Sequence, residues 1–225
     1  LVDGREEGQE YYLRGTYTHQ NLDFSNDFLH LANEGFKEIS LEPVVVKDSE
    51  EISIRFEDLE QIYDEYNKIY RYLKEKIDSG EKINFYHYNI NLKGGPCVYK
   101  RVSACGAGFE YIAITPSGDI YPCHQFVGKR DFIIGNVNDL SKNKIRHPEL
   151  VSEFKDANIY KKEDCNKCWA RFYCSGGCQA NNHEFTNSIL KPYTIGCALQ
   201  KKRIEMAIAL KVYENSKNTC TAVSE

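Results

Sequence analysis

The sequence predicts an α/β domain followed by an irregular, cysteine-rich domain that contains a β-hairpin. Three observations support this fold class. Strand and helix patterns alternate over residues 10–46, a long amphipathic helix follows them, and all the cysteines lie after residue 96 in a loop-rich region. The chain has 225 residues, which is enough to bury a hydrophobic core without crosslinks.

The first part of the chain predicts a strand, a helix and a second strand. Residues 10–18 are rich in Tyr and Thr, which is typical of a strand. Residues 23–35 carry apolar side chains at helical spacing and end at Gly35, and residues 36–46 predict a strand that Pro43 interrupts. A unit of this length implies parallel strands with a helix packed on one face.

Two further helices and a hairpin follow. Residues 56–80 repeat apolar side chains at helical spacing, which predicts a helix that ends at Gly80. Residues 108–123 alternate on both sides of a turn signal and predict a hairpin. A last helix, over about 199–213, has one apolar side and one side with Lys and Arg, and we expect the last dozen residues to fray. Its apolar side consists of Leu199, Ile204, Ile208 and Val212.

Composition excludes several classes of partner. The formal net charge is −4, from 29 basic and 33 acidic residues, and no polybasic block indicates a nucleic acid or an anionic membrane surface. No stretch is apolar for the eighteen or so residues of a membrane span. The start lacks an initiator Met and a signal peptide, so we expect the chain to begin within a longer protein. A reducing cytoplasm fits free thiols and metal ligation best.

The cysteines provide the strongest functional signal. The stretch CNKCWARFYCSGGC, from Cys165 to Cys178, has the spacing C-x2-C-x5-C-x3-C. Setting aside Cys220 in the polar tail leaves eight cysteines, enough for two four-sulfur sites. From the spacing alone the four adjacent thiols can close one site. The second site would then use Cys97, Cys105, Cys123 and Cys197.

Three interpretations of these thiols compete. The C-x2-C spacing fits structural zinc. Iron–sulfur clusters fit the eight thiols, the Gly-rich flanks and the lack of paired His ligands. Disulfides are the weakest interpretation, because nine cysteines are about 4% of the chain and the count is odd.

A longer pattern favours clusters. Cys105, Gly118, Cys123, the run from Cys165 and finally Cys197 resemble the SPASM domain over about residues 97–200. This domain is the C-terminal extension of radical S-adenosylmethionine (SAM) enzymes that modify peptides. The stretches YYLRGTYT and FKEISLEPVV resemble the last strand–helix–strand portion of the radical SAM partial (β/α) barrel.

The resemblance implies a division of the chain. Residues 1–82 would be the C-terminal portion of the partial barrel, and residues 83–200 a SPASM domain whose hairpin and loops surround two clusters. Residues 201–225 would be a C-terminal helix and tail. The stretches GFKEISLEPVV and GPCVYKRVSACGAGFEYIAITPSGDIYPCHQFVG resemble most the maturases of six-cysteine (SCIFF) peptides, among the sactipeptide and ranthipeptide synthases, which form thioether crosslinks.

The resemblance also implies an interleaved set of ligands. A first auxiliary 4Fe-4S cluster would be held by Cys105, Cys123 and Cys178. The second would be held by Cys165, Cys168, Cys174 and Cys197. Cys97 aligns with the first cluster's remaining ligand, and if it does not ligate, one iron stays open and could bind a substrate thiolate.

Further cofactors and partners follow from the same resemblance. The full-length enzyme would bind SAM and a third 4Fe-4S cluster, but the C-x3-C-x2-C signature for that cluster does not occur in this chain, so alone it is not expected to cleave SAM. Arg14 could meet the SAM carboxylate, and no catalytic residue is identified. The expected partners are a cysteine-rich precursor peptide with its leader and a reductant protein such as flavodoxin or ferredoxin.

Other functions stay open from sequence. One is formylglycine formation in sulfatases, although that branch usually carries Asp where His124 follows Cys123 here. Another is an electron-transfer module whose clusters only relay electrons. The last is a zinc-binding interaction domain without a redox role.

Overall fold

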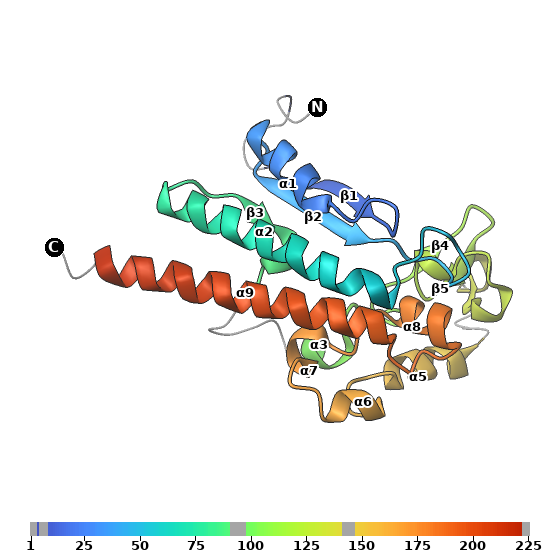
Figure 1. The fold of residues 1–225 in the computed structure, drawn as a ribbon. Helices are drawn as coiled ribbons and strands as arrows, with labels where there is room; N and C mark the ends of the chain where they lie inside the picture. Colours follow the sequence, from blue (N-terminus) through green and yellow to red (C-terminus); the bar gives the residue numbers. More distant parts are fainter. Residues whose placement is uncertain (1–3, 5–8, 91–97, 141–146, 222–225) are drawn as a thin grey trace. The chain divides into compact units, whose positions relative to one another are not determined.

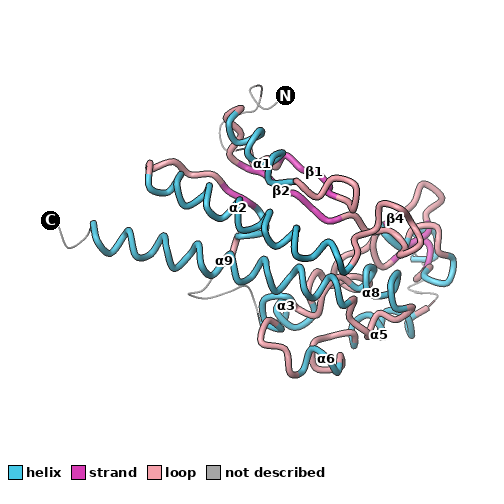
Figure 2. The backbone as a smooth tube through the Cα atoms, viewed as in Figure 1, coloured by secondary structure: helices cyan, strands magenta, loops and turns pink. Residues whose placement is uncertain are grey.

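A computed structural model describes the chain except residues 1–3, 5–8, 91–97, 141–146 and 222–225 (Figures 1 and 2). The fold divides into two compact units. The first comprises residues 1–93 with 198–225, and the second comprises residues 94–197. The functional division predicted from sequence, with boundaries at residues 82 and 200 and a separate C-terminal helix and tail, stays a prediction.

The first unit contains an open parallel sheet. Its strands are β1 (Leu13–Tyr17), β2 (Glu38–Pro43) and β3 (Asn84–Phe85), in the order β1-β2-β3. Helix α1 (Phe24–Asn33) connects β1 to β2, and the chain leaves it through Gly35, whose φ is +92°. The predicted parallel strand–helix–strand unit is therefore confirmed.

Aromatic side chains form the core of this unit. Tyr17 stacks on Phe24 with ring centroids 4.2 Å apart, and Phe28 meets Phe85 edge to face at 5.2 Å. Helix α2 (Leu59–Asp78) follows a short 3-10 helix, η1 (Phe56–Asp58), and a second one, η2 (Tyr86–Tyr88), follows β3. The predicted helix over 56–80 is confirmed, and the chain turns at Gly80 with φ +78°.

Helix α9 (Thr194–Thr221) is longer than the sequence pattern predicts, so the expected fraying of the last dozen residues is wrong as far as Thr221. Its side chains contact α2 first near the middle of that helix and then at its C-terminal end, through hydrogen-bonded pairs among other contacts. The pairs are Lys202 with Asn67, Arg203 with Tyr66, and Tyr213 with Asp78. The two helices therefore run parallel, as Figure 1 shows.

The buried side of α9 differs from the predicted one. Val212 is 58% exposed, whereas Ala207 and Leu210 are buried together with Leu199 and Ile204. Arg203 is also buried, although the sequence pattern puts the Arg residues on the polar side. The predicted apolar side is thus correct near its start and wrong near its end.

The second unit begins with α3 (Val98–Ser103) and contains a small antiparallel sheet. Strands β4 (Ala113–Ile114), β5 (Asp119–Tyr121) and β6 (Gly135–Asn136) pair in that order. The predicted hairpin is confirmed, and its turn closes where Gly118 N–H donates to Thr115 O at 2.8 Å.

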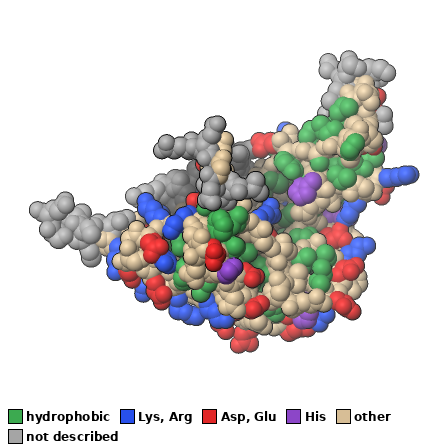
Figure 3. Space-filling model, turned by 90° about the horizontal axis from the view of Figure 1, so that it is seen from above, with side chains coloured by type: hydrophobic (Ala, Val, Ile, Leu, Met, Phe, Trp, Pro, Cys, Tyr) green, Lys and Arg blue, Asp and Glu red, His purple; other side chains and the backbone are tan. Residues whose placement is uncertain are grey.

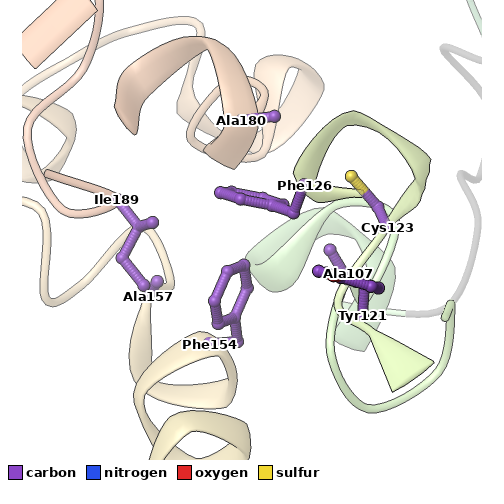
Figure 4. Packing of buried hydrophobic residues seen from close by; sticks show 8 residues of the cluster. All are labelled: Ala107, Tyr121, Cys123, Phe126, Phe154, Ala157, Ala180 and Ile189. Atoms are coloured by element: carbon purple, nitrogen blue, oxygen red, sulfur yellow. The ribbon is translucent and has the colours of Figure 1, made fainter. Parts of the chain in front are cut away.

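Short helices make up the rest of this unit. They are the 3-10 helices η3 (His124–Phe126) and η4 (Arg130–Phe132), and the α-helices α4 (Val137–Leu140), α5 (Pro148–Asp156), α6 (Glu163–Asn166), α7 (Arg171–Cys174) and α8 (Gln179–Thr186). Phe126 and Phe154, both fully buried, lie at the centre of the core with ring centroids 5.3 Å apart (Figure 4). Cys123 belongs to the same buried cluster.

The surface carries both signs of charge. Figure 3 shows acidic and basic side chains interspersed on one face of the molecule, with hydrophobic side chains between them. Within the described ranges, no helix combines the length and the apolar character needed to cross a membrane.

Candidate functional site

Two short helices of the second unit present the first three cysteines of the CNKCWARFYCSGGC stretch. Cys165 lies on α6, Cys168 follows that helix, and Cys174 is the last residue of α7. The N–H of Cys168 donates to the carbonyl of Cys165 at 3.1 Å. The C-x2-C segment is therefore a tight turn that brings two thiols to one side.

The next turn depends on an unusual backbone. Ser175, Gly176 and Gly177 all have positive φ, at 58°, 87° and 74°, a region in which glycine is unstrained. In this conformation the N–H groups of Gly177 and Gly176 donate to the sulfur of Cys174. Successive N–H groups that point to one place form a concave site for an anion.

The other thiols of the second unit lie on similar turns. Cys178 is the N-cap residue of α8, and the N–H groups of Asn181 and Ala180 lower the pKa of its thiol. Cys123 lies two residues after the end of β5, and the backbone N–H groups of Gln125 and Phe126 lower the pKa of its thiol.

Electrostatic interactions show that Cys105, Cys123 and Cys178 are neighbours. Burial raises the pKa of the Cys123 thiol, and negative charge on Cys178 and on Cys105 raises it further. Burial likewise raises the pKa of Cys178, and Cys105 adds to that rise. Cys178 thus interacts with two cysteines that lie more than fifty residues away in sequence.

Cys165, Cys168 and Cys174 are a second group of neighbours. Burial raises the pKa of the Cys165 thiol, Lys162 opposes this rise, and Cys174 and Cys168 add to it. Burial also raises the pKa of Cys174, where the N–H groups of the Gly-Gly turn oppose it and Cys168 adds to it.

Two of the predicted ligands need separate mention. Cys197 lies in the first turn of α9. It interacts with the ammonium of Lys162, as do Cys178 of the first group and Cys165 and Cys174 of the second. Cys97 lies outside the described residues. Cys105, Cys123, Cys165, Cys168, Cys174 and Cys178 are free thiols.

The chemistry of this donor set fits an iron–sulfur cluster. Cluster potentials depend on backbone N–H groups near the sulfurs, and such groups lower the pKa of the Cys123, Cys174 and Cys178 thiols. In the described part of the chain, no three His, Cys, Asp or Glu side chains meet closely enough to hold one metal ion. A 4Fe-4S cube does not need them to, because each thiolate binds a different iron.

A second polar site lies on the sheet of the first unit. The parallel register pairs Arg14 with Ser40 and Thr16 with Glu42. Glu42 Oε1 lies 3.9 Å from Arg14 Nη2 and 3.1 Å from His87 Nε2, and it accepts a hydrogen bond from Ser40 Oγ at 3.1 Å. The side chain of Arg14 is 71% exposed, so its charge is available to a ligand.

Glu42 is held in its charged form. Burial opposes ionisation, but His87, Arg203 and Ser40 together lower the pKa of Glu42 to about 2. The pKa of His87 is lowered by burial and by Arg203, against the effect of Glu42. Near neutral pH we therefore take His87 as neutral and Glu42 as anionic, with Arg203 as the buried cation that balances it.

Sequence reasoning did not find three of these residues. His87 follows the short strand β3, Arg203 lies on a helix whose other Lys and Arg residues are more exposed, and Lys162 belongs to a charged loop. No spacing or motif marks them, because their burial depends on contacts between segments far apart in the sequence.

A family model for SPASM, an iron–sulfur cluster-binding domain, matches residues 105–169. This part of the chain is therefore similar to a SPASM domain, and the resemblance to radical SAM enzymes that carry this domain is confirmed. The match includes Cys105, Cys123, Cys165 and Cys168, and the remaining proposed ligands lie outside it.

Two curated proteins are similar to the chain. The antilisterial bacteriocin subtilosin biosynthesis protein AlbA of Bacillus subtilis is 36% identical over 86 residues, which are 37% of this chain and 18% of that protein. The mycofactocin maturase MftC of Mycolicibacterium smegmatis is 27% identical over 168 residues, which are 72% of this chain and 41% of that protein. The matched regions thus span less than half of either relative.

Solved structures share the fold. The anaerobic sulfatase-maturating enzyme anSMEcpe with bound AdoMet superposes with a TM-score of 0.68 at 19% identity, over 92% of this chain and 55% of that one. The same enzyme with AdoMet and the Cp18Cys peptide gives a TM-score of 0.68 at 18% identity, over 92% of this chain and 58% of that one. The chain therefore shares the fold of a little over half of that enzyme.

Proposed function

We propose that this chain is the C-terminal half of a radical SAM peptide maturase that forms Cys-derived thioether crosslinks in a ribosomally made precursor peptide. The observation that carries the proposal is the similarity of the chain to a bacteriocin biosynthesis protein, at 36% identity over 86 residues. The match to a mycofactocin maturase over 72% of the chain supports peptide modification in general.

The proposed ligand sets are supported by the two groups of neighbouring thiols. Cys105, Cys123 and Cys178, with Cys97 as a candidate fourth ligand, would hold one auxiliary cluster. Cys165, Cys168, Cys174 and Cys197 would hold the other. When bound, the clusters supply an acceptor for the electron that thioether formation releases, and an iron without a protein ligand could hold the substrate sulfur.

The residues of the chain contribute positioning and charge. The N–H groups aimed at Cys123, Cys174 and Cys178 stabilise their thiolates once metal displaces the protons. On the sheet, the exposed guanidinium of Arg14 would bind the carboxylate of SAM. The negative charge of Glu42 would hold the Arg14 side chain in place.

Formylglycine formation is a second candidate, because anSMEcpe shares the fold over 92% of the chain. His124 argues against it. This residue occupies the position after Cys123 where that branch usually has Asp, and its Nδ1 lies 3.2 Å from the hydroxyl of Tyr111.

The test uses the longer enzyme to which we assign the chain, reconstituted anaerobically with SAM, a low-potential reductant and a cysteine-rich peptide. We expect about eight auxiliary iron atoms with matching sulfide, formation of 5'-deoxyadenosine, and a peptide that loses two hydrogens and one thiol. Zinc without sulfide would refute the redox function. Clusters without deoxyadenosine would favour an electron relay, and an aldehyde in the product would favour formylglycine formation.

A further inference from the structure

A lysine is buried among the cysteines of the second unit. Lys162 is 1% exposed, although lysine is almost never fully buried without an anionic partner. Its carbonyl accepts the N–H of Cys165 at 3.0 Å, so it lies one turn before the first cysteine of the CNKCWARFYCSGGC stretch. The neighbouring Lys161 is exposed.

The ammonium of Lys162 reaches the Gly-Gly turn between Cys174 and Cys178. Nζ donates to the carbonyl of Gly176 at 2.7 Å, and the N–H of that same glycine donates to the sulfur of Cys174. A Cβ on Gly176 would come within 3.2 Å of Nζ. Glycine at this position therefore permits both the left-handed backbone and the close approach of the ammonium.

This contact does not account for the charge. The carbonyl of Gly176 also accepts a hydrogen bond from Nδ2 of Asn182, which is 2% exposed, at 3.3 Å. An ammonium has three N–H bonds, and among the described residues Gly176 is the one recorded acceptor for Nζ. A buried cation with so few partners is costly unless an anion lies close to it.

The surrounding groups identify that anion. The Gly176 carbonyl that Nζ binds lies in the turn between Cys174 and Cys178, one thiol of each group. Burial lowers the pKa of Lys162, and Cys165, Cys174, Cys178 and Cys197 oppose that shift. A 4Fe-4S cube held by four thiolates carries net negative charge, and each added electron makes it more negative. A fixed positive charge beside the cube therefore favours its reduced form.

We propose that Lys162 is a built-in countercation of the cluster assigned to Cys165, Cys168, Cys174 and Cys197, and that its charge raises the reduction potential of that cluster. This inference rests on the ligand set of the proposed function. Lys162 keeps its proton throughout, and the cluster takes up one electron per reduction. In the test that electron comes from dithionite.

The experiment is a redox titration of the full, anaerobically reconstituted enzyme, followed by electron paramagnetic resonance so that each cluster is measured separately. Lys162→Met removes the charge and the hydrogen bond, and Lys162→Gln removes the charge but keeps an N–H donor. We expect both to lower the equilibrium constant for reduction of this cluster at least about tenfold, which is ~59 mV for one electron. Lys161→Met, which removes an exposed charge one residue away, is the matched control and should leave it unchanged.

Each outcome is decisive. An unchanged potential in Lys162→Gln would refute the charge effect, even if Lys162→Met loses iron. If Met and Gln variants both fail to retain this cluster and Lys162→Arg retains it, positive charge is required, which supports the proposal. If the Arg variant also fails, the side chain has only a packing role and the proposal is wrong. A wild-type enzyme without iron and sulfide would refute the proposed function instead.

Discussion

Two double variants, each of which removes Cys178 and one other cysteine, test the interleaved arrangement of the cysteines. Cys178 is four residues from Cys174, so spacing alone allows both in one site, whereas the family resemblance assigns them to different clusters. Its electrostatic neighbours include Cys105, which precedes it by 73 positions in the numbering of the chain. Two double variants, Cys105→Ala with Cys178→Ala and Cys174→Ala with Cys178→Ala, therefore remove the same number of thiols with different consequences.

The expected loss of iron from each double variant follows from the two groups of thiols. Cys105 and Cys178 fall in one group, so their joint loss removes two ligands from the first cluster and none from the second. We expect auxiliary iron to fall from about eight to about four atoms per chain, with the spectrum of the second cluster unchanged. Loss of Cys174 and Cys178 takes one ligand from each cluster, so both spectra should change together.

The assay combines iron and sulfide analysis with electron paramagnetic resonance of the reduced enzyme, prepared without oxygen. Because ligands of one cluster act as a unit, effects within a group should be non-additive and effects between groups additive. The opposite pattern would refute the reasoning. In that case the Cys174 and Cys178 double variant would lose one cluster cleanly, while the Cys105 and Cys178 double variant would disturb both.

Three further predictions concern stability and ligand binding. Phe126→Ala should lower the free energy of unfolding by about 3–5 kcal/mol in chemical denaturation, because Phe126 is fully buried against two other rings, whereas Ile114→Ala, at a side chain 56% exposed, should stay within about 0.5 kcal/mol. The lowered pKa of Glu42, about 2 instead of 4.5, stabilises the fold above pH 4.5 by at most about 3 kcal/mol, and this is lost as the pH falls from 4.5 towards 2. Hydrogen exchange across β2 should show that loss, and Glu42→Gln should abolish its pH dependence. Arg14→Ala should weaken SAM binding to the full enzyme at least about tenfold in calorimetry without a change in iron content; unchanged affinity would exclude Arg14 from the SAM site.

Local patterns predicted much of the fold. The strand–helix–strand unit, the helix that ends at Gly80 and the hairpin around Thr115–Gly118 were all found by periodicity and turn residues. These features depend on interactions within a few residues, which a single sequence records directly. The prediction for the end of the last helix was wrong because burial there does not follow from the local pattern. Val212 has the right spacing for the buried side, but tertiary contacts there bury Ala207 and Leu210 instead.

The candidate site was only partly visible in the sequence. The cysteines were found by their spacing, because thiols so close together in sequence are typical of metal or cluster ligands. The charged groups that surround them were not. Lys162 and Arg203 look like ordinary surface residues of a charged loop and an amphipathic helix, yet both are buried. Burial of a charge results from packing between distant segments, and no local pattern reports it.

The charges around the cysteines of the second unit are consistent with the proposed binding of a large anion. Burial raises the pKa of Cys123, Cys174 and Cys178, so their thiols favour the protonated form by themselves. Yet backbone N–H groups point at all three sulfurs, an arrangement that stabilises thiolates, and Lys162 adds a positive charge without access to solvent. In a chain without metal, these donors and this cation would face neutral thiols, so the negative charge that they can stabilise would be absent. Metal ligation removes the conflict, because it deprotonates the thiols and supplies the negative charge that the N–H groups and the ammonium already face. The polar groups are thus arranged for the loaded state of the protein, and metal binding and folding of this unit should be coupled.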